Sequence, residues 1–282
     1  MAASPLIDAA ELRALVDAGT PPVLLDVRWK LGATDHRDAY LAGHVPGARF
    51  VDLETDLAGP RDPAAGRHPL PDPATFAARA AAWGIGADDA VVAYDDNGGL
   101  AAARLWWLLR WIGHERVQVL DGGLGAWRAA GGDVEVGDVT VARAGPDPAP
   151  PVSHRPAMGT VSAEQVAAGT VGPLLDARAG ERYRGELEPV DPVAGHIPGA
   201  LSAPTTDNLL ADGRFADPDT LRRRFTDLGL TPGEPAAVYC GSGVTAAHEI
   251  LALEVAGFPG VALYPASWSG WVSDPDHPVA TI

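Results

Sequence analysis

The chain is predicted to be an α/β protein made of two tandem copies of one unit, each a mostly parallel sheet flanked by helices. Two observations predict this. The sequence repeats itself, because the stretches 24–28 (LLDVR) and 43–48 (GHVPGA) return as 174–178 (LLDAR) and 195–200 (GHIPGA). In both halves, short Val- and Leu-rich runs also alternate with helical stretches, as in a parallel sheet whose strands are joined by helices.

The length of 282 residues suits two domains. We expect a first domain at 1–143, a linker at 144–156 and a second domain at 157–282. The linker is placed there because five prolines fall between positions 146 and 156, which makes a semi-stiff connector.

The first half begins with a helix, since Asp8 followed by Glu11 has the pattern of a capping box. A strand is expected at 91–94. It leads to a helix over 100–112 that is apolar almost all round and is therefore expected to be buried. A second strand is expected at 117–120.

The second half repeats this order. An apolar run at 235–239 predicts the strand, and apolar residues at helical spacing from 244 to 258 predict the following helix. Gly257 is placed to end that helix. A last strand is expected at 261–264.

The charge excludes some partners. The formal net charge is −16, from 37 acidic and 21 basic residues, whereas nucleic acids and anionic membranes require a basic surface. No run approaches the roughly 18 apolar residues of a membrane-spanning helix, and the first residues lack the pattern of a signal peptide. One cysteine cannot form an internal disulfide. We therefore expect a cytoplasmic protein.

That single cysteine opens a loop between the expected strand and helix of the second half. The loop consists of Cys240, Gly241, Ser242, Gly243, Val244 and Thr245. Backbone N–H groups of such a turn, together with the positive end of the helix dipole, favour a thiolate. A cysteine that merely fills the core has no need of flanking glycines. We predict a nucleophile, and its sulfur is expected to be accessible to solvent.

The repeat supplies an internal control. The position of Cys240 is taken by Asp95 in the first half, so only the second half has a nucleophile there. His44 and His196 occupy matching positions in the two copies and are therefore assigned to the fold, not to acid–base chemistry.

Several chemistries can be set aside. A cysteine phosphatase needs an arginine six residues after its nucleophile, where this chain has Ala246. A serine esterase needs glycines two residues before and two residues after its serine, where Ser242 has Cys240 and Val244. The residue types allow a papain-like protease, but its local signature is missing. No metal motif, Cys-x-x-Cys pair or phosphate-binding loop occurs, so neither a metal nor a cofactor is expected.

The segment 240–246 (CGSGVTA) resembles the active loop of 3-mercaptopyruvate sulfurtransferases, the sister group of rhodanese. The stretches 176–178 (DAR), 181–185 (ERYRG) and 195–200, and the pair at 267–268 (SW), are also similar to the rhodanese family. The resemblance implies two rhodanese-like domains, of which the second is catalytic. It also implies that Cys240 takes sulfur from a small anionic donor as a persulfide and passes it to cyanide, a thiol or a thioredoxin-like acceptor.

The resemblance also implies a donor site. Arg182 matches the substrate-binding arginine of the family, and Arg184 is a weaker second candidate. Backbone N–H groups of Gly241, Gly243, Val244 and Thr245, with the loop hydroxyls, would hold the persulfide. A further arginine of the family is missing, because Glu188 and Pro189 are followed by Val190.

The donor is expected to be 3-mercaptopyruvate. Rhodanese proper has two cations in the loop, which suit the dianion thiosulfate, whereas this chain has Gly241 and Ser242. Thiosulfate remains the alternative donor. A third possibility belongs to another class, namely a non-catalytic rhodanese-like module that binds or senses persulfide.

Mercaptopyruvate enzymes of the family are thought to use a Ser–His–acid relay, which would put the active site in a cleft between the two halves. Ser242 matches the serine, and His68, within 66–71 (GRHPLP), resembles the histidine. The acid is either Glu54 or Asp52.

Overall fold

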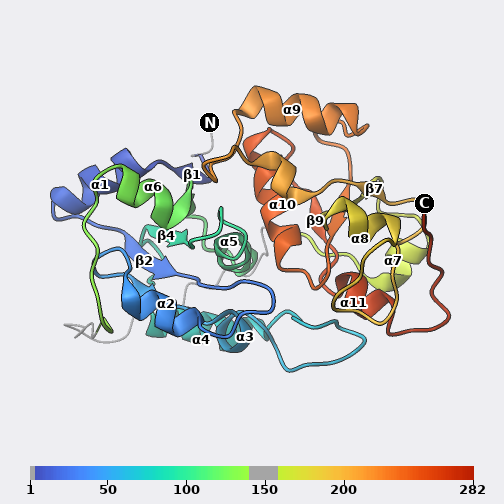
Figure 1. Ribbon diagram of the computed structural model, residues 1–282, viewed down its shortest axis with the longest axis horizontal. Helices are drawn as coiled ribbons and strands as arrows, with labels where there is room; N and C mark the ends of the chain where they lie inside the picture. The colour runs from blue at the N-terminus through green and yellow to red at the C-terminus, as the bar shows by residue number, and fades with distance from the viewer. Residues whose placement is uncertain (1–3, 140–157) are drawn as a thin grey trace. The chain divides into compact units, whose positions relative to one another are not determined.

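The computed structural model describes residues 4–139 and 158–282 (Figure 1). These residues form two compact units that exchange short segments. The first unit contains 4–58, 71–139 and 210–215, and the second contains 59–70, 158–209 and 216–282. The predicted linker, 144–156, lies outside the described residues. The segment 59–70, which contains His68, packs with the half of the chain that carries Cys240.

The first unit has a sheet of five parallel strands in the order β1-β5-β4-β2-β3. The strands are β1 (Leu6–Ile7), β2 (Val23–Asp26), β3 (Arg49–Phe50), β4 (Val91–Tyr94) and β5 (Val117–Leu120). The strands predicted at 91–94 and 117–120 are confirmed. All four residues of the central β4 are buried, which explains its continuous apolar run, because a central parallel strand is covered on both faces.

The helices of the first unit are α1 (Ala9–Asp17), α2 (His36–Ala42), α3 (Leu53–Asp56), α4 (Pro73–Ala82), α5 (Ala102–Trp111) and α6 (Gly123–Ala129). As predicted, α1 begins after Asp8, whose carboxylate accepts a hydrogen bond from the Glu11 N–H at 2.7 Å. The expected helix over 100–112 is α5, and it is buried from Ala102 to Leu109. Helices α1 and α6 lie side by side (Figure 1).

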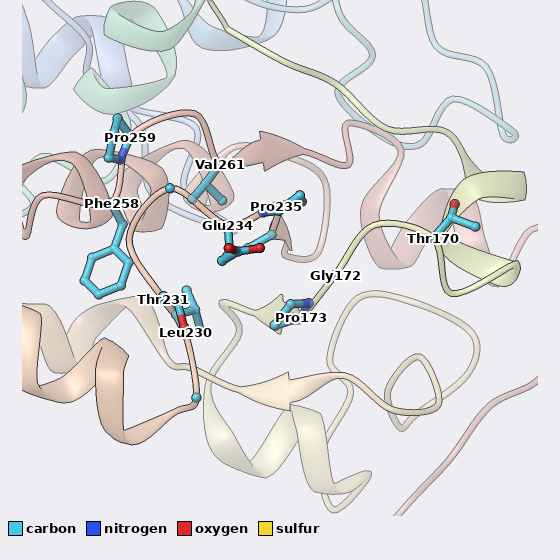
Figure 2. Close-up of a pocket in the computed structure, with 13 residues that line it drawn as sticks. Thr170, Gly172, Pro173, Leu230, Thr231, Glu234, Pro235, Phe258, Pro259 and Val261 are labelled. Carbon is cyan, nitrogen blue, oxygen red and sulfur yellow. The ribbon is translucent and has the colours of Figure 1, made fainter.

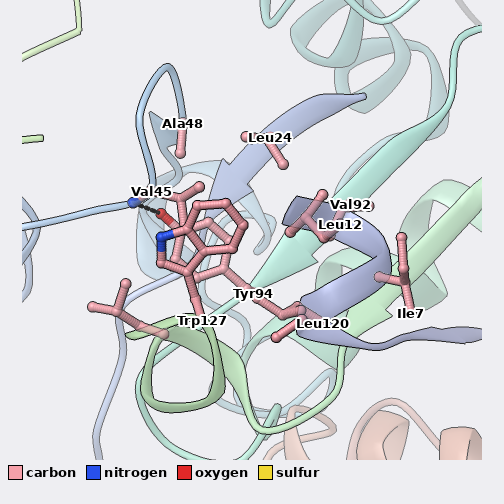
Figure 3. Close-up of a cluster of buried hydrophobic side chains, with 11 residues drawn as sticks. Ile7, Leu12, Leu24, Val45, Ala48, Val92, Tyr94, Leu120 and Trp127 are labelled. Carbon is pink, nitrogen blue, oxygen red and sulfur yellow. Dashed lines mark hydrogen bonds between the residues drawn. The ribbon is translucent and has the colours of Figure 1, made fainter. Parts of the chain in front are cut away.

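The core of the first unit explains why the GHVPGA motif recurs. Tyr94, at the end of β4, lies beside Trp127 in an apolar cluster and accepts a hydrogen bond from the Val45 N–H at 2.9 Å (Figure 3). In the second unit, Tyr239 accepts the same bond from the Ile197 N–H at 3.1 Å. The motif therefore docks the chain on the tyrosine that ends the central strand, so both copies need it.

The two repeated histidines have matching surroundings. The Nδ1 of His44 lies 3.0 Å from the Tyr40 carbonyl oxygen, and its ring stacks on that tyrosine. The Nδ1 of His196 lies 2.8 Å from the Tyr183 carbonyl oxygen, again with the rings stacked. Both are buried parts of the fold, in line with the role expected from the repeat.

The second unit has four parallel strands in the order β7-β6-β8-β9. They are β6 (Leu174–Asp176), β7 (Leu201–Ser202), β8 (Ala237–Tyr239) and β9 (Ala262–Leu263). A single parallel bridge from Thr160 to Leu263 stands where β1 pairs with β5 in the first unit. The two units therefore share one strand arrangement.

The helical segments of the second unit are α7 (Ala163–Ala167), α8 (Gly180–Arg184), the 3-10 helix η1 (Thr205–Asn208), α9 (Pro218–Asp227), α10 (Thr245–Val255) and α11 (Ser267–Trp271). Helix α10 is the one predicted after Cys240, and Gly257 follows its end with a φ of 81°. In the described ranges, no helix is long and apolar enough to cross a membrane.

A cavity of about 350 Å³ opens in the second unit (Figure 2). Its lining includes Pro173, Ala236 and Val261, which immediately precede β6, β8 and β9. It therefore lies at the amino-terminal ends of the strands. Ligands of open parallel sheets bind at the carboxyl ends, where Cys240 follows β8, so this cavity is not the candidate active site.

Candidate active site

Cys240 directly follows β8, the strand that pairs with β6 on one side and β9 on the other. The chain turns at Gly243, which has a φ of 80°, and enters α10 at Thr245. A Cβ on Gly243 would lie 2.6 Å from the Pro265 carbonyl oxygen. Glycine is required here for both backbone conformation and space.

The predicted N–H cradle is present in part. The Gly243 N–H donates a hydrogen bond to the Cys240 Sγ at 3.1 Å, and the amino-terminal end of α10 lies next to this loop. Both features place partial positive charge next to the sulfur.

The sulfur is not open to solvent. Cys240 is only 1% exposed, so the expectation of an accessible thiol is wrong. The reason is that the glycine-rich loop folds closely over its own first residue.

The turn at 266–269 is hydrogen-bonded to this loop. The Cys240 N–H donates to the Ser267 Oγ at 3.1 Å, and the N–H groups of Trp268 and Ser269 donate to the carbonyls of Cys240 and Gly241. Ser267 has a φ of 53° and is the one non-glycine residue with positive φ in the described ranges. Such strain persists only where the surroundings enforce it.

The structure brings His68 and Ser242 together. His68 Nδ1 lies 2.7 Å from Ser242 Oγ, and both side chains are buried. The segment that carries His68 is anchored on the same turn, because the Arg67 N–H donates to the Ser269 Oγ at 3.0 Å. A hydroxyl and an imidazole at this distance can pass a proton from one to the other. Ser242 follows the nucleophile by two residues in the chain.

The two candidate acids lie in the first unit. The Asp52 carboxylate caps α3 by accepting a hydrogen bond from the Thr55 N–H at 3.0 Å. Glu54 accepts one from the Trp29 Nε1 at 3.2 Å. Asp52 thus already serves as a helix cap.

Arg182 extends from α8 toward the loop. A Cβ built on Gly241 would lie 3.3 Å from the Arg182 Nη1, and 3.0 Å from the Nη2 of a residue that the sequence reasoning missed, Arg67. The only signal for Arg67 was its place next to His68. Arg184 is 44% exposed and pairs with Glu186 at 2.8 Å.

Two carboxylates neutralise these guanidinium groups. Glu188 accepts hydrogen bonds from the Arg182 Nη2 at 2.6 Å and Nε at 3.1 Å, and Asp191 contacts both Arg182 and Arg67. Burial alone would raise the pKa of Glu188, but the hydrogen bonds from Arg182 and the Asp191 N–H outweigh it and hold that pKa below its usual value. Glu188 is therefore an anion at neutral pH.

The Asp–Arg pair that occurs in both copies also contacts the site. The Arg178 guanidinium binds Asp176 at 2.6 Å and lies 4.5 Å from the centre of the Trp268 ring. It also reaches Glu188 at 3.3 Å. Asp26 and Arg28 form the same pair in the first unit, so the pair belongs to the fold and here also orients Glu188.

The first unit shows what the loop does without a cysteine. The Asp95 carboxylate is fully buried and accepts four backbone hydrogen bonds at 2.8 to 3.1 Å. The donors are the N–H groups of Asn97, Gly99, Ala101 and Ala102. Burial raises the pKa of Asp95, and the backbone N–H groups of its loop are already bonded to its side chain, so this loop offers no nucleophile.

In the described part of the chain, no group of three or more His, Cys, Asp or Glu side chains is arranged to hold a metal ion.

Comparison with known proteins gives one consistent result. The model of the rhodanese-like domain matches residues 8–130 and 161–274. The chain is 47% identical over 288 residues to a probable 3-mercaptopyruvate sulfurtransferase of Pseudomonas aeruginosa, covering 100% of this chain and 99% of the relative. It is 46% identical over 274 residues to a putative thiosulfate sulfurtransferase, SseB, of Mycobacterium tuberculosis, covering 97% of this chain and 96% of the relative.

A solved structure agrees. The crystal structure of SseA from Escherichia coli, described as a 3-mercaptopyruvate sulfotransferase of rhodanese fold, superposes with a TM-score of 0.79 at 33% identity. The match covers 94% of this chain and 99% of that one.

Proposed function

The chain belongs to the rhodanese family of sulfurtransferases, and from this premise we propose that it moves a sulfur atom from 3-mercaptopyruvate, through a Cys240 persulfide, to a thiol or to cyanide. One observation carries the proposal. The Cys240 sulfur accepts the Gly243 N–H at the start of α10, and the His68–Ser242 pair lies two residues further on. The same loop thus holds a nucleophile and a group that can take a proton.

The reaction has two steps. The Cys240 thiolate attacks the donor sulfur, so that an S–S bond forms while the donor C–S bond breaks, and the bonding pair leaves on carbon as the enolate of pyruvate. The donor thiol gives its proton to Ser242 and His68, and that proton then goes to the enolate carbon. The acceptor next attacks the outer sulfur, and Cys240 is released as a thiolate.

Arg182 would hold the donor carboxylate, because its guanidinium lies beside Gly241 and has the planar geometry that binds carboxylates. The loop N–H groups of Gly241, Gly243, Val244 and Thr245 would stabilise the persulfide anion. Arg184 remains the weaker candidate for donor binding.

Glu54 is the better candidate for the relay acid, because Asp52 already caps α3. We expect Glu54→Gln to lower turnover of 3-mercaptopyruvate while leaving stability intact. The variant Asp52→Ala should instead weaken the protein by about 1 kcal/mol through loss of the cap. The opposite pattern would assign the acid to Asp52.

Thiosulfate is the second candidate donor, favoured by the name of the relative from Mycobacterium tuberculosis. The uncharged Ser242 beside the sulfur argues against it, because a dianion needs cations there. The thioredoxin-like acceptor and the cytoplasmic location stay predictions.

The test is to incubate the protein with each donor and measure the mass of the peptide that contains Cys240. We expect a gain of one sulfur atom with 3-mercaptopyruvate, loss of that sulfur to cyanide, and no gain in Cys240→Ser. Values of kcat/KM for both donors, measured side by side, decide between them. A persulfide that forms but passes to no acceptor would support the sensor alternative.

A further inference from the structure

We propose that Asp191 occupies the carboxylate site formed by Arg67 and Arg182 in the resting enzyme, and that the donor carboxylate takes its place on Arg67. This inference rests on the proposed function. It adds Arg67 as a second donor-binding residue and makes Asp191 an internal competitor of the donor.

The two guanidinium groups meet beside the nucleophile. A Cβ on Gly241, the residue after Cys240, would lie 3.0 Å from the Arg67 Nη2 and within 3.5 Å of both Nη atoms of Arg182. Two planar guanidinium groups that converge on one point bind a carboxylate through several charge-assisted hydrogen bonds. The family's further arginine is replaced in this chain by Val190, which is exposed. Arg67 therefore supplies the second guanidinium, from another segment of the chain.

The two resident carboxylates are held differently. Glu188 has two short bonds from Arg182 and also accepts the N–H groups of Val190 and Asp191 at 3.2 and 3.1 Å. The Asp191 carboxylate has one oxygen paired with Arg67 and the other 3.4 Å from the Arg182 Nη2. In the described part of the chain, no backbone N–H donates to it. Asp191 is therefore the carboxylate that an incoming donor can replace.

The charge balance requires a replacement. Three guanidinium groups and three carboxylates form one connected cluster around the loop, and its members are Arg67, Arg178, Arg182, Asp176, Glu188 and Asp191. The cluster is neutral and mostly buried, and Asp191 is only 5% exposed. A donor carboxylate that entered without displacing one of these would leave an uncompensated buried charge, which is strongly unfavourable.

There is also space beside Arg67 and Asp191. A cavity of about 220 Å³ is bordered by Arg67, Asp191 and Ser269. This is several times the roughly 30 Å³ that one water molecule takes in the liquid. It provides room for a small acid or for the displaced Asp191 side chain.

Asp191→Asn tests the competition, because it removes the charge and keeps the size. We expect the KM for 3-mercaptopyruvate and the inhibition constant of pyruvate to fall by about tenfold, with kcat little changed. The KM for thiosulfate should fall further, because thiosulfate is a dianion. Arg67→Gln should raise both constants by about tenfold. The control is Glu181→Gln, which removes the same charge from an exposed side chain next to Arg182 and should change either constant less than about twofold.

A KM that stays the same or rises in Asp191→Asn would overturn the inference, since Asp191 would then orient Arg67. Calorimetric binding of pyruvate to proteins that also carry Cys240→Ser separates the two proposals. If Asp191→Asn and Arg67→Gln shift pyruvate affinity as expected, while the protein that keeps Cys240 forms no persulfide from 3-mercaptopyruvate, this inference is supported and the proposed function is contradicted. If the persulfide forms normally but pyruvate affinity does not shift in the variants, the proposed function is supported and this inference is contradicted.

Discussion

His68 Nδ1 lies 2.7 Å from Ser242 Oγ, although 174 residues separate the two in the chain. Both side chains are buried, and Ser242 follows the nucleophile by two residues. Burial strengthens a hydrogen bond between polar groups. This pair therefore couples a base to the loop that carries Cys240.

His68→Ala should lower kcat/KM for 3-mercaptopyruvate by about 10²- to 10⁴-fold and change its pH profile, because the donor thiol loses its base. Thiosulfate has no thiol proton and should be affected far less. Ser242→Ala should give the same defect, and the double variant should be no worse than either single one. Equal losses with both donors would mean that His68 supports the loop and does not move a proton.

Ser242→Lys should raise the turnover of thiosulfate relative to 3-mercaptopyruvate. A cation beside the sulfur favours the more highly charged donor by about 1 to 3 kcal/mol. The ratio of the two kcat/KM values measures this shift, and Ser242→Met is a control of similar length without the charge. An unchanged ratio would remove loop charge as the basis for donor choice.

The fold could be predicted because its signals are local and repeated. The strand that ends at Tyr239, the helix after Cys240 and its end at Gly257 all follow from apolar spacing and glycine placement. The exchange of Cys240 for Asp95 follows from aligning the two copies. The hydrogen bonds that fill the Asp95 loop did not follow from the sequence.

The contacts of the 59–70 segment were harder to predict. Arg67 lies in a loop without periodicity, so its approach to Gly241 depends on long-range packing. The burial of Cys240 was missed for a similar reason, because it depends on how closely the loop folds and on the turn at 266–269. Residue types indicated the chemistry, but not which groups surround the sulfur.

Gly243→Ala should slow persulfide formation. The φ of 80° disfavours alanine, and its Cβ would lie 2.6 Å from the Pro265 carbonyl oxygen, so the loop must move and the N–H bond to the Cys240 sulfur is lost. Gly199→Ala is the matched control, because Gly199 has a φ of 82° but nothing within 4 Å of a Cβ. Both variants should lose about 1 to 2 kcal/mol of stability from backbone strain. Only Gly243→Ala should affect the rate, and equal rates would show that the Gly243 N–H does not activate the thiol.

The ion pair of Arg182 with Glu188 should make part of the stability depend on pH. Burial raises the pKa of Glu188, but the hydrogen bonds from Arg182 and the Asp191 N–H lower it further, to below the ordinary value of 4.5. The folded protein therefore binds this proton less tightly than the unfolded chain. The stabilisation is present above pH 4.5 and is lost as the pH falls through the lowered pKa.

Glu188→Gln should thus cost about 1 to 3 kcal/mol at neutral pH, and the gap to the unsubstituted protein should close as the pH falls below 4.5. Urea unfolding followed by tryptophan fluorescence measures this gap at each pH. Glu186→Gln is the control, because its pair with Arg184 is exposed and screened by solvent, so its pH-dependent gap should be much smaller. A gap for Glu188→Gln that persists below pH 4.5 would mean that the side chain stabilises the site through packing, not through its charge.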